Sequence, residues 1–497
     1  MIHNHLLDRL IDRTDRSLPT LFLRRCLKIH NFVYALYQYR IGNTRLSRRL
    51  MAGRRAKPEF EKDFCARVEE ICDILERGYE EDPHPRNVPV CWNRKVLLSL
   101  HYSLPYDTIG YSIRSHSILH HLGNRGLDVM AATRLGYPGK QARYKGQNLW
   151  TEDFVDGVCY IRLKSDHDWW QYPDSKYIEA YARVLGQLAQ TNDISVLHAA
   201  SNFINGLAAA RAARTAGCKS IYEVRGLWHL SQAVKEPGFE NTDHFLYSDI
   251  MECAAVREAD SVVAISETLK SWIVNNTDVE PEKVTVIPNA VDINKFKPRP
   301  VNIELKKRLG LEKKTVLGFI GSLTAYEGLD FLIKAAGTLV DRGANIALLV
   351  IGHGYAEKKL KKIASSFTRD CIRFLGQVPF EEIGKYYSII DIFSFPRNKY
   401  EVCRFVPPLK VLEAMAIGKP VIVSDLPPLL EMVTDGITGA VCRADNFQSL
   451  LTTIQRLYDN PAERQILGET ARKWVSDKRS WGCISEKYVD LYRKTCA

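Results

Sequence analysis

The residues best suited to chemistry stand at the start of a helix predicted in the second half of the chain. Residues 408–425 read PLKVLEAMAIGKPVIVSD, with prolines at the helix start and Gly418 at its end. Such a start presents unpaired backbone N–H groups and a positive dipole end, which suit a phosphate leaving group. Lys410 adds a full charge there, and the Glu413 carboxylate suits two vicinal hydroxyls, as in a ribose. The alternative is an exposed Lys and Glu that serve only solubility.

A second set of candidates stands at the ends of predicted strands in the first half. Gly110 follows the first strand and opens a helix, where such folds let the backbone approach a phosphate closely. Arg114, one turn later, faces either a cleft or the solvent. His198 ends a strand, as a catalytic group or as a structural hydrogen-bonding group. Glu223 and Arg225 also end a strand, and they suit acceptor recognition and a buried ion pair equally.

The scaffold for these residues begins at Asn93. Short runs of Val, Ile and Leu alternate with amphipathic segments of helix length, which is typical of parallel sheets with crossover helices. One such helix, FINGLAAARAARTAG, has Gly217 in place as its C-terminal cap. The predicted strands are residues 95–101, 127–133, 157–163, 194–200, 219–225, 261–266 and 283–289, then 315–322, 344–352, 371–377, 390–396 and 419–425.

The two halves are separated near residue 295, where Pro288, Pro298 and Pro300 interrupt regular structure. Two Rossmann-like domains of the α/β class, joined there, are predicted. Because open α/β sheets bind ligands at the carboxyl ends of their strands, we expect the site in the cleft between the domains. The predicted division is 1–92 (a basic, helical N-terminal extension), 93–294 (first domain), 295–474 (second domain) and 475–497 (a terminal helix).

The net charge of +11 is concentrated at the N-terminus. Residues 1–57 contain thirteen Lys and Arg against three Asp. Within them, residues 20–50 mix basic side chains with Leu, Phe, Tyr and Ile, which suits a helix lying on an anionic membrane surface. A solvated helix face or a partner-docking arm is the open alternative. Nucleic acid is not expected as a partner, since the stretch contains no recognisable nucleic-acid-binding motif.

The cysteines and the hydropathy of the chain indicate the cellular compartment of the protein. The twelve cysteines occur singly, without a CxxC pair, which is typical of reduced thiols and gives no metal-ligand pattern. No apolar run reaches the roughly 20 residues that cross a bilayer, and the N-terminus lacks the apolar stretch of a signal peptide. We therefore expect a cytoplasmic protein, peripheral on the inner face of the plasma membrane.

Four segments in this order and spacing resemble the family 4 retaining glycosyltransferases. They are VIPNAVD (286–292), GFIGSLTAYEGLDFLIKAA (318–336), VIGHGYAEKKLKKIA (350–364) and LEAMAIGKPVIVSD (412–425). Other segments, such as HYSLPYDTIGYSIRS and FPRNKYEVCRFVPPLKVLEAMA, are similar to a bacterial subgroup associated with exopolysaccharide and exosortase-type export.

The resemblance implies the GT-B fold. The second domain would bind a nucleoside-diphosphate sugar, and the first would bind a glycan or lipid-linked acceptor. It also implies retention of anomeric configuration, metal-independent hexosyl transfer and a role in surface polysaccharide or glycoconjugate synthesis. In this family the last helix crosses back to the first domain, where Trp481, Tyr488, Leu491 and Tyr492 would be core residues.

The sequence departs from the family at the cations that face the diphosphate. Ser322 stands where the family has Arg, and Glu327 stands where it has Lys. Of the paired glutamates separated by seven residues, Phe405 replaces the first and Glu413 remains. We expect other cations to compensate. The predicted catalytic residues are Lys410, Arg397 and His198; the donor-binding residues are Gly110, Ser322, Glu327, Arg404, Lys410 and Glu413; the acceptor-side residues are Arg114, Glu223 and Arg225.

Other functions and cofactors fit the sequence less well. Gly352 and Gly354 follow a strand but lack the third glycine and the acidic residue of a nicotinamide site, so no cofactor is expected. Asp166 and Asp168 resemble a metal-binding pair, but they lie in a polar loop, and no metal is expected. The competing hypotheses are a catalytically silent binding or regulatory subunit of the same fold and a sugar-nucleotide epimerase.

Overall fold

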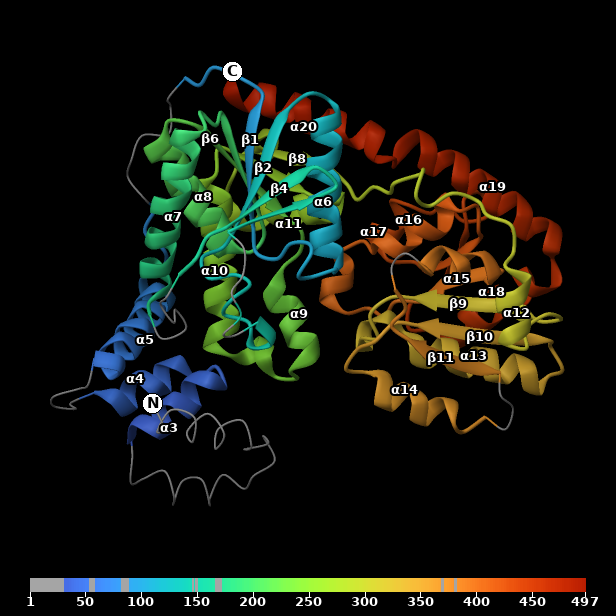
Figure 1. The fold of residues 1–497 in the computed structure, drawn as a ribbon. Coiled ribbons are helices and arrows are strands. Elements are labelled where there is room, and N and C mark those ends of the chain that lie inside the picture. Colours follow the sequence, from blue (N-terminus) through green and yellow to red (C-terminus); the bar gives the residue numbers. More distant parts are fainter. Residues whose placement is uncertain are drawn as a thin grey trace.

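The computed structural model describes residues 31–52, 59–81, 89–144, 147, 151–165, 172–367, 371–379 and 382–497. Asp166 and Asp168 lie outside these residues. The chain forms two α/β units, each built on a mostly parallel sheet with helices on both faces (Figure 1). The two Rossmann-like units predicted from the alternation of strands and helices are thereby confirmed.

The first sheet has the strand order β3-β4-β2-β1-β5-β6-β7-β8. All neighbouring strands run parallel except β3 and β4, which form an antiparallel hairpin at one edge. The strands are β1 (Lys95–Leu100), β2 (Asp128–Thr133), β3 (Glu152–Val155), β4 (Val158–Arg162), β5 (Val196–Ala200), β6 (Lys219–Val224), β7 (Ser261–Ala264) and β8 (Val284–Val286). The helices are α6 (Gly110–Asn124), α7 (Asp174–Thr191), α8 (Phe203–Ala216), α9 (Trp228–Lys235), α10 (Asp243–Glu258) and α11 (Glu267–Thr277).

The second sheet is fully parallel, in the order β11-β10-β9-β12-β13-β14. Its strands are β9 (Thr315–Ile320), β10 (Ile346–Ile351), β11 (Ile372–Gly376), β12 (Ile392–Phe395), β13 (Val421–Ser424) and β14 (Ala440–Cys442). Its helices are α12 (Ile303–Arg308), α13 (Leu329–Asp341), α14 (Glu357–Ala364), α15 (Ile383–Ile389), α16 (Leu409–Ala416), α17 (Pro427–Leu430), α18 (Phe447–Asp459) and α19 (Pro461–Lys478), with 3₁₀ turns η5 (Ala325–Glu327) and η7 (Glu401–Arg404).

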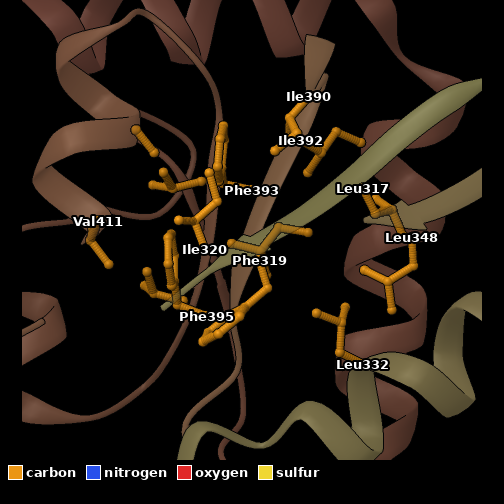
Figure 2. Packing of buried hydrophobic residues seen from close by; sticks show 14 of the residues in the cluster. Leu317, Phe319, Ile320, Leu332, Leu348, Ile390, Ile392, Phe393, Phe395 and Val411 are labelled. Atoms are coloured by element: carbon orange, nitrogen blue, oxygen red, sulfur yellow. The ribbon is translucent and has the colours of Figure 1, made fainter. Parts of the chain in front are cut away.

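The cores follow from the period-2 alternation of the strands. In β1, Leu97 packs on one face of the sheet, whereas Val96 and Leu98 pack on the other. In the second unit, Phe319 and Phe395 meet at 5.8 Å between ring centroids within a buried cluster (Figure 2). Truncating a fully buried leucine of such a core costs about 2–5 kcal/mol.

The C-terminal helices connect the two units. Helix α19 packs against α16, and α20 (Trp481–Cys496) returns to pack against α6 of the first unit (Figure 1). Trp481, Tyr488, Leu491 and Tyr492 are buried in one apolar cluster with residues of strand β1. The predicted cap is confirmed, because Gly217 ends α8 in the left-handed conformation with φ 71°.

The basic N-terminal region is helical where the structure describes it. Helices α3 (Asn31–Arg40), α4 (Thr44–Met51) and α5 (Glu59–Arg77) share a small apolar core, and α5 packs on α10. Two arginines of α4 bind carboxylates of the same chain: Arg45 pairs with Asp243 at 2.8 Å, and Arg48 pairs with Glu76. Part of the basic charge is therefore neutralised internally, and membrane docking stays a prediction. Within the described residues, no helix is both long and apolar enough to cross a bilayer.

Candidate functional site

Two helices from different units begin at the same place in the cleft. Helix α6 starts at Gly110 after β1, and α16 starts at Leu409 after β12. A β-carbon built on Gly110 would lie 3.4 Å from Leu409 Cδ1, so the two first turns are in contact distance. Both starts present unpaired N–H groups and positive dipole ends. This convergence is the strongest feature of the site for an anionic group.

Lys410, in the first turn of α16, lies beside Glu413. Its Nζ atom donates to Glu413 Oε2 at 2.9 Å and to Oε1 at 3.2 Å. The Tyr387 hydroxyl donates to the same carboxylate at 2.6 Å. Burial, and then the adjacent Glu413 carboxylate, raises the pKa of Tyr387 well above its usual value, so the hydroxyl stays a donor. The Lys410 side chain is 28% exposed, whereas Glu413 is buried beneath it, so the lysine is the more open member of the pair.

Glu327 and Arg397 form a buried ion pair where the family has its lysine. The guanidinium donates from Nη2 to Glu327 Oε1 at 2.6 Å and from Nε to Oε2 at 3.0 Å. Both side chains are 8% exposed. The Arg397 Nη1 atom donates to the Val406 carbonyl at 2.7 Å. Arg397 is therefore engaged by a carboxylate instead of pointing freely at a ligand, and its direct role toward a diphosphate stays a prediction.

A glycine allows this pair to form. Gly328 directly follows Glu327 with φ 69°, a conformation that L side chains rarely adopt. A β-carbon on Gly328 would lie 1.8 Å from the Pro396 carbonyl oxygen, next to Arg397. The loops after β9 and β12 can therefore meet only because residue 328 is glycine.

The other predicted donor residues lie nearby on the second unit. Ser322 is exposed immediately after β9, where Gly352 packs backbone to backbone on Gly321. Arg404 is exposed at the end of η7, and its Nη1 atom pairs with Glu401 at 2.9 Å. Lys410, Arg397 and Arg404 each have a carboxylate partner, and their compensation for the missing family cations stays a prediction.

The predicted acceptor-side residues come together in one buried cluster. Arg114 donates to Glu223 Oε1 from Nε at 2.8 Å and from Nη2 at 2.5 Å. Arg225 donates to Glu223 Oε2 at 2.9 Å, and the His198 Nε2 atom lies 3.1 Å from the same oxygen. Burial alone would raise the pKa of Glu223, but Arg114 and Arg225 hold it well below its usual value. The geometry favours the buried ion pair over direct acceptor contact.

His198 is enclosed on both sides. Its Nδ1 atom lies 2.8 Å from the Tyr492 hydroxyl of α20, and its side chain is fully buried. Burial lowers the pKa of His198, so the ring is neutral near pH 7. An imidazole without exposed surface cannot exchange a proton with a substrate in this conformation, and structural hydrogen bonding is the role that the geometry favours.

The buried cluster around Glu223 also binds the segment that connects the two units, and the sequence did not predict this contact. Arg114 donates to the carbonyls of Ile287 at 2.9 Å and Pro288 at 3.1 Å. It reaches Asn289 Oδ1 at 2.9 Å, and the Asn289 amide donates to the Pro407 carbonyl of the second unit at 2.8 Å. The only sequence signal was Asn289 within the VIPNAVD segment.

Aromatic residues flank the cleft side of the first unit, and they too were not predicted from the sequence. The rings of Tyr102 and Trp228 stack at 6.1 Å with an interplanar angle of 8°. Tyr111 packs edge-on against both rings, at 6.1 and 6.3 Å. They follow β1 and β6, at the carboxyl edge where ligands of open α/β sheets bind. Isolated aromatic residues in a loop or in the first turn of a helix carry no such signal in the sequence.

Two opposed α/β units with a cleft at their carboxyl edges define a GT-B architecture. Residues 110–295 match the model of Glycosyltransferase Family 4, and residues 301–474 match that of Glycosyl transferases group 1. The chain belongs to the family 4 glycosyltransferases, in agreement with the resemblance seen in its motifs.

Individual relatives agree with this family. An uncharacterized glycosyltransferase of Methanocaldococcus jannaschii is 28% identical over 268 residues, 54% of this chain and 67% of the relative. The capsular polysaccharide biosynthesis glycosyltransferase CapM of Staphylococcus aureus is 28% identical over 283 residues, 55% of this chain and 69% of the relative. The HepE protein of Anabaena, solved in complex with UDP-glucose, superposes with a TM-score of 0.61 at 18% identity, covering 80% of this chain and 99% of that chain.

Proposed function

We propose that this glycosyltransferase moves a sugar from a nucleoside-diphosphate sugar to a glycan or lipid-linked acceptor, with retention of configuration and without a metal ion. The observation that carries the proposal is the convergence of the α6 and α16 starts at Gly110 and Leu409, with Lys410 beside them. The UDP-glucose complex of HepE supports the donor class, and the name of CapM supports an acceptor in surface polysaccharide synthesis.

The chemistry follows from where negative charge develops. As the bond between the anomeric carbon and the diphosphate oxygen breaks, charge grows on the diphosphate and the sugar becomes cation-like. N–H groups from two helix starts and the Lys410 ammonium would stabilise that diphosphate. The N–H groups are fixed by the fold, and together with the Lys410 ammonium they would supply the charge that a metal ion supplies in other transferases. Retention is proposed from the family resemblance.

Lys410 and Glu413 would act as a pair in donor binding. Glu413 is anchored by Tyr387, so its remaining lone pairs are held in a fixed direction. We propose that they accept hydrogen bonds from the ribose hydroxyls while the Lys410 ammonium turns toward the diphosphate. The exposed part of Lys410 makes this movement sterically simple.

A second candidate function is a nucleotide-binding protein without turnover. The observation in its favour is the Glu327–Arg397 pair, because it places a neutralised ion pair where the family has a lysine. Such a protein would bind a nucleoside-diphosphate sugar without releasing the diphosphate.

A donor screen separates the two functions. Purified full-length protein is mixed with single sugar nucleotides, with and without EDTA, and nucleoside diphosphate release is followed together with nucleotide binding. Release from one donor that persists in EDTA supports the transferase. Binding without release supports the silent protein.

A point variant tests the role of Lys410. Lys410→Ala should lower release by roughly 10²-fold, the scale of one lost electrostatic donor at a developing anion. Lys359→Ala, which removes an exposed lysine of α14, serves as the matched control and should leave release unchanged. Full turnover by Lys410→Ala would contradict the proposed role.

A further inference from the structure

A second pocket lies beside the cleft and belongs to both units. Helices α9, α10 and α11 form its walls from the first unit, and η7 with the start of α17 closes it from the second. Its volume of about 460 Å³ falls in the range of small-molecule sites, roughly 300–1,000 Å³. The residues that decide its chemistry are His229, Asp249, Trp272, Asn275, Arg404 and Phe405.

One wall of this pocket is aromatic and fixed by both units. The Trp272 ring is half-buried and meets the ring of Phe405 at 6.4 Å between centroids. Phe405 is buried in the apolar core of the first unit, although it belongs to the loop of the second. The Ser266 hydroxyl donates to the Phe405 carbonyl at 2.8 Å and anchors that loop. A rigid ring of this kind offers a flat apolar surface to the C–H face of a sugar.

The pocket lining also carries hydrogen-bonding groups, on α9, α10 and α11. The His229 Nε2 atom lies 3.3 Å from Asp249 Oδ1; His229 is buried, whereas the Asp249 side chain is 40% exposed. On α11, Asn275 and Asn276 follow Trp272 by three and four residues, so they share its helix face. Asn276 donates to the Trp272 carbonyl at 2.7 Å. The carboxylate and the amides are thus held beside the aromatic wall.

The charges of the lining favour a neutral ligand. Burial lowers the pKa of His229 to about 4, so this ring is uncharged near pH 7. The Arg404 guanidinium is paired with Glu401, and Asp249 adds a negative charge. The lining therefore lacks the excess positive charge that a phosphate group would need. Vicinal hydroxyls, by contrast, match a carboxylate, amides and a guanidinium.

The pocket is close to the point where the two helices meet. Phe405 in its wall precedes Leu409 by four residues, so their α-carbons lie within roughly 14 Å of each other. We propose that this pocket is a saccharide subsite that holds a neutral sugar unit of an extended acceptor glycan, away from the unit that receives the transferred sugar. This inference rests on the proposed function, and it identifies the acceptor as a carbohydrate chain.

Binding of uncharged oligosaccharides tests the subsite. Full-length protein is titrated with maltotriose, cellotriose, mannotriose and chitotriose, with glucose 6-phosphate as the anionic probe, and binding is followed by saturation-transfer NMR and calorimetry. We expect at least one trisaccharide to bind. Trp272→Ala and Asn275→Ala should each weaken that binding about fivefold or more, the scale of one lost contact.

Two further variants separate the subsite from a folding effect. Trp272→Phe keeps an aromatic ring and should recover most of the affinity. Phe154→Ala removes an aromatic side chain that is 70% exposed on β3 of the described structure, and it should bind like the wild type. Binding of no trisaccharide, equal binding by Trp272→Ala, or tighter binding of glucose 6-phosphate would each overturn the proposal.

Nucleotide titration keeps this test apart from the proposed function. UDP, GDP and ADP are titrated with the same protein preparation. Nucleotide binding without trisaccharide binding would remove the subsite and leave the donor proposal standing. Trisaccharide binding that depends on Trp272, without binding of any nucleotide, would leave the subsite standing and count against the transferase.

Discussion

Replacing Glu223 with Gln is the sharpest structural perturbation of the buried cluster. Its carboxylate is fully buried and accepts hydrogen bonds from Arg114, Arg225 and the Tyr488 hydroxyl, the last at 2.9 Å. A glutamine of the same shape leaves two buried guanidinium groups without a counter-charge. Removing one partner of a buried ion pair costs about 3–5 kcal/mol. Because Arg114 also binds the connection at Ile287–Asn289, the loss should loosen the first unit against the second.

The assay is urea unfolding, followed by circular dichroism and by tryptophan fluorescence. Two units need not unfold in one step, so the first transition is the quantity compared. The matched control is Glu486→Gln on α20, whose carboxylate is 67% exposed and lies 3.9 Å from Arg125. We expect a change within about 0.5 kcal/mol for the control. A Glu223→Gln protein that is as stable as this control would refute the account of a charged buried cluster.

The remaining predictions concern pH and backbone space. Folding lowers the pKa of Glu223, so its carboxylate stabilises the protein above the unfolded-state pKa of about 4.3, and this stabilisation is lost as the pH falls further. The difference in free energy of unfolding between wild type and Glu223→Gln should therefore shrink below about pH 4. Glu252 behaves in the opposite way, because burial raises its pKa to about 7. Between pH 4.5 and 7 the wild type should lose up to about 3 kcal/mol of stability relative to Glu252→Gln. A difference in stability that does not change with pH would contradict this. In thermal unfolding, Gly328→Ala should lose much more stability than Gly343→Ala. Both glycines have a positive φ, but only at Gly328 would the added β-carbon meet a carbonyl oxygen, at 1.8 Å. Equal losses of stability would show that the space around residue 328 is not limiting.

Much of the fold was predictable because local sequence patterns indicate its strands and helices. Runs such as residues 95–101 and 315–322 became β1 and β9, and Gly110 opens α6 as expected. Buried strands of a parallel sheet are continuous apolar runs, which sequence shows directly. The short strands β3 and β14 were missed: β3 carries exposed residues on the edge of the sheet, and β14 has only three residues. Neither strand is long enough to show a recognisable alternation of apolar and polar residues.

The pairing of charges at the site could be predicted only where it is local. Lys410 and Glu413 are three residues apart on one helix, a spacing that brings side chains together. Glu327 and Arg397 are separated by 70 residues, and Arg114 and Glu223 by 109. The first contact depends on how the loops after β9 and β12 meet, and the second on how α6 packs against β6, and a single sequence encodes neither in a visible pattern. The compensation by Arg397, Arg404 and Lys410 stays a prediction.

The decisive measurement is diphosphate release from a sugar nucleotide in the presence of EDTA. We expect one donor to be cleaved or transferred at the same rate with and without EDTA, and Lys410→Ala to lower this rate by roughly 10²-fold while Lys359→Ala does not. Release that requires a divalent ion, or that is unchanged in Lys410→Ala, would contradict the claim that the two helix starts and Lys410 stabilise the departing diphosphate.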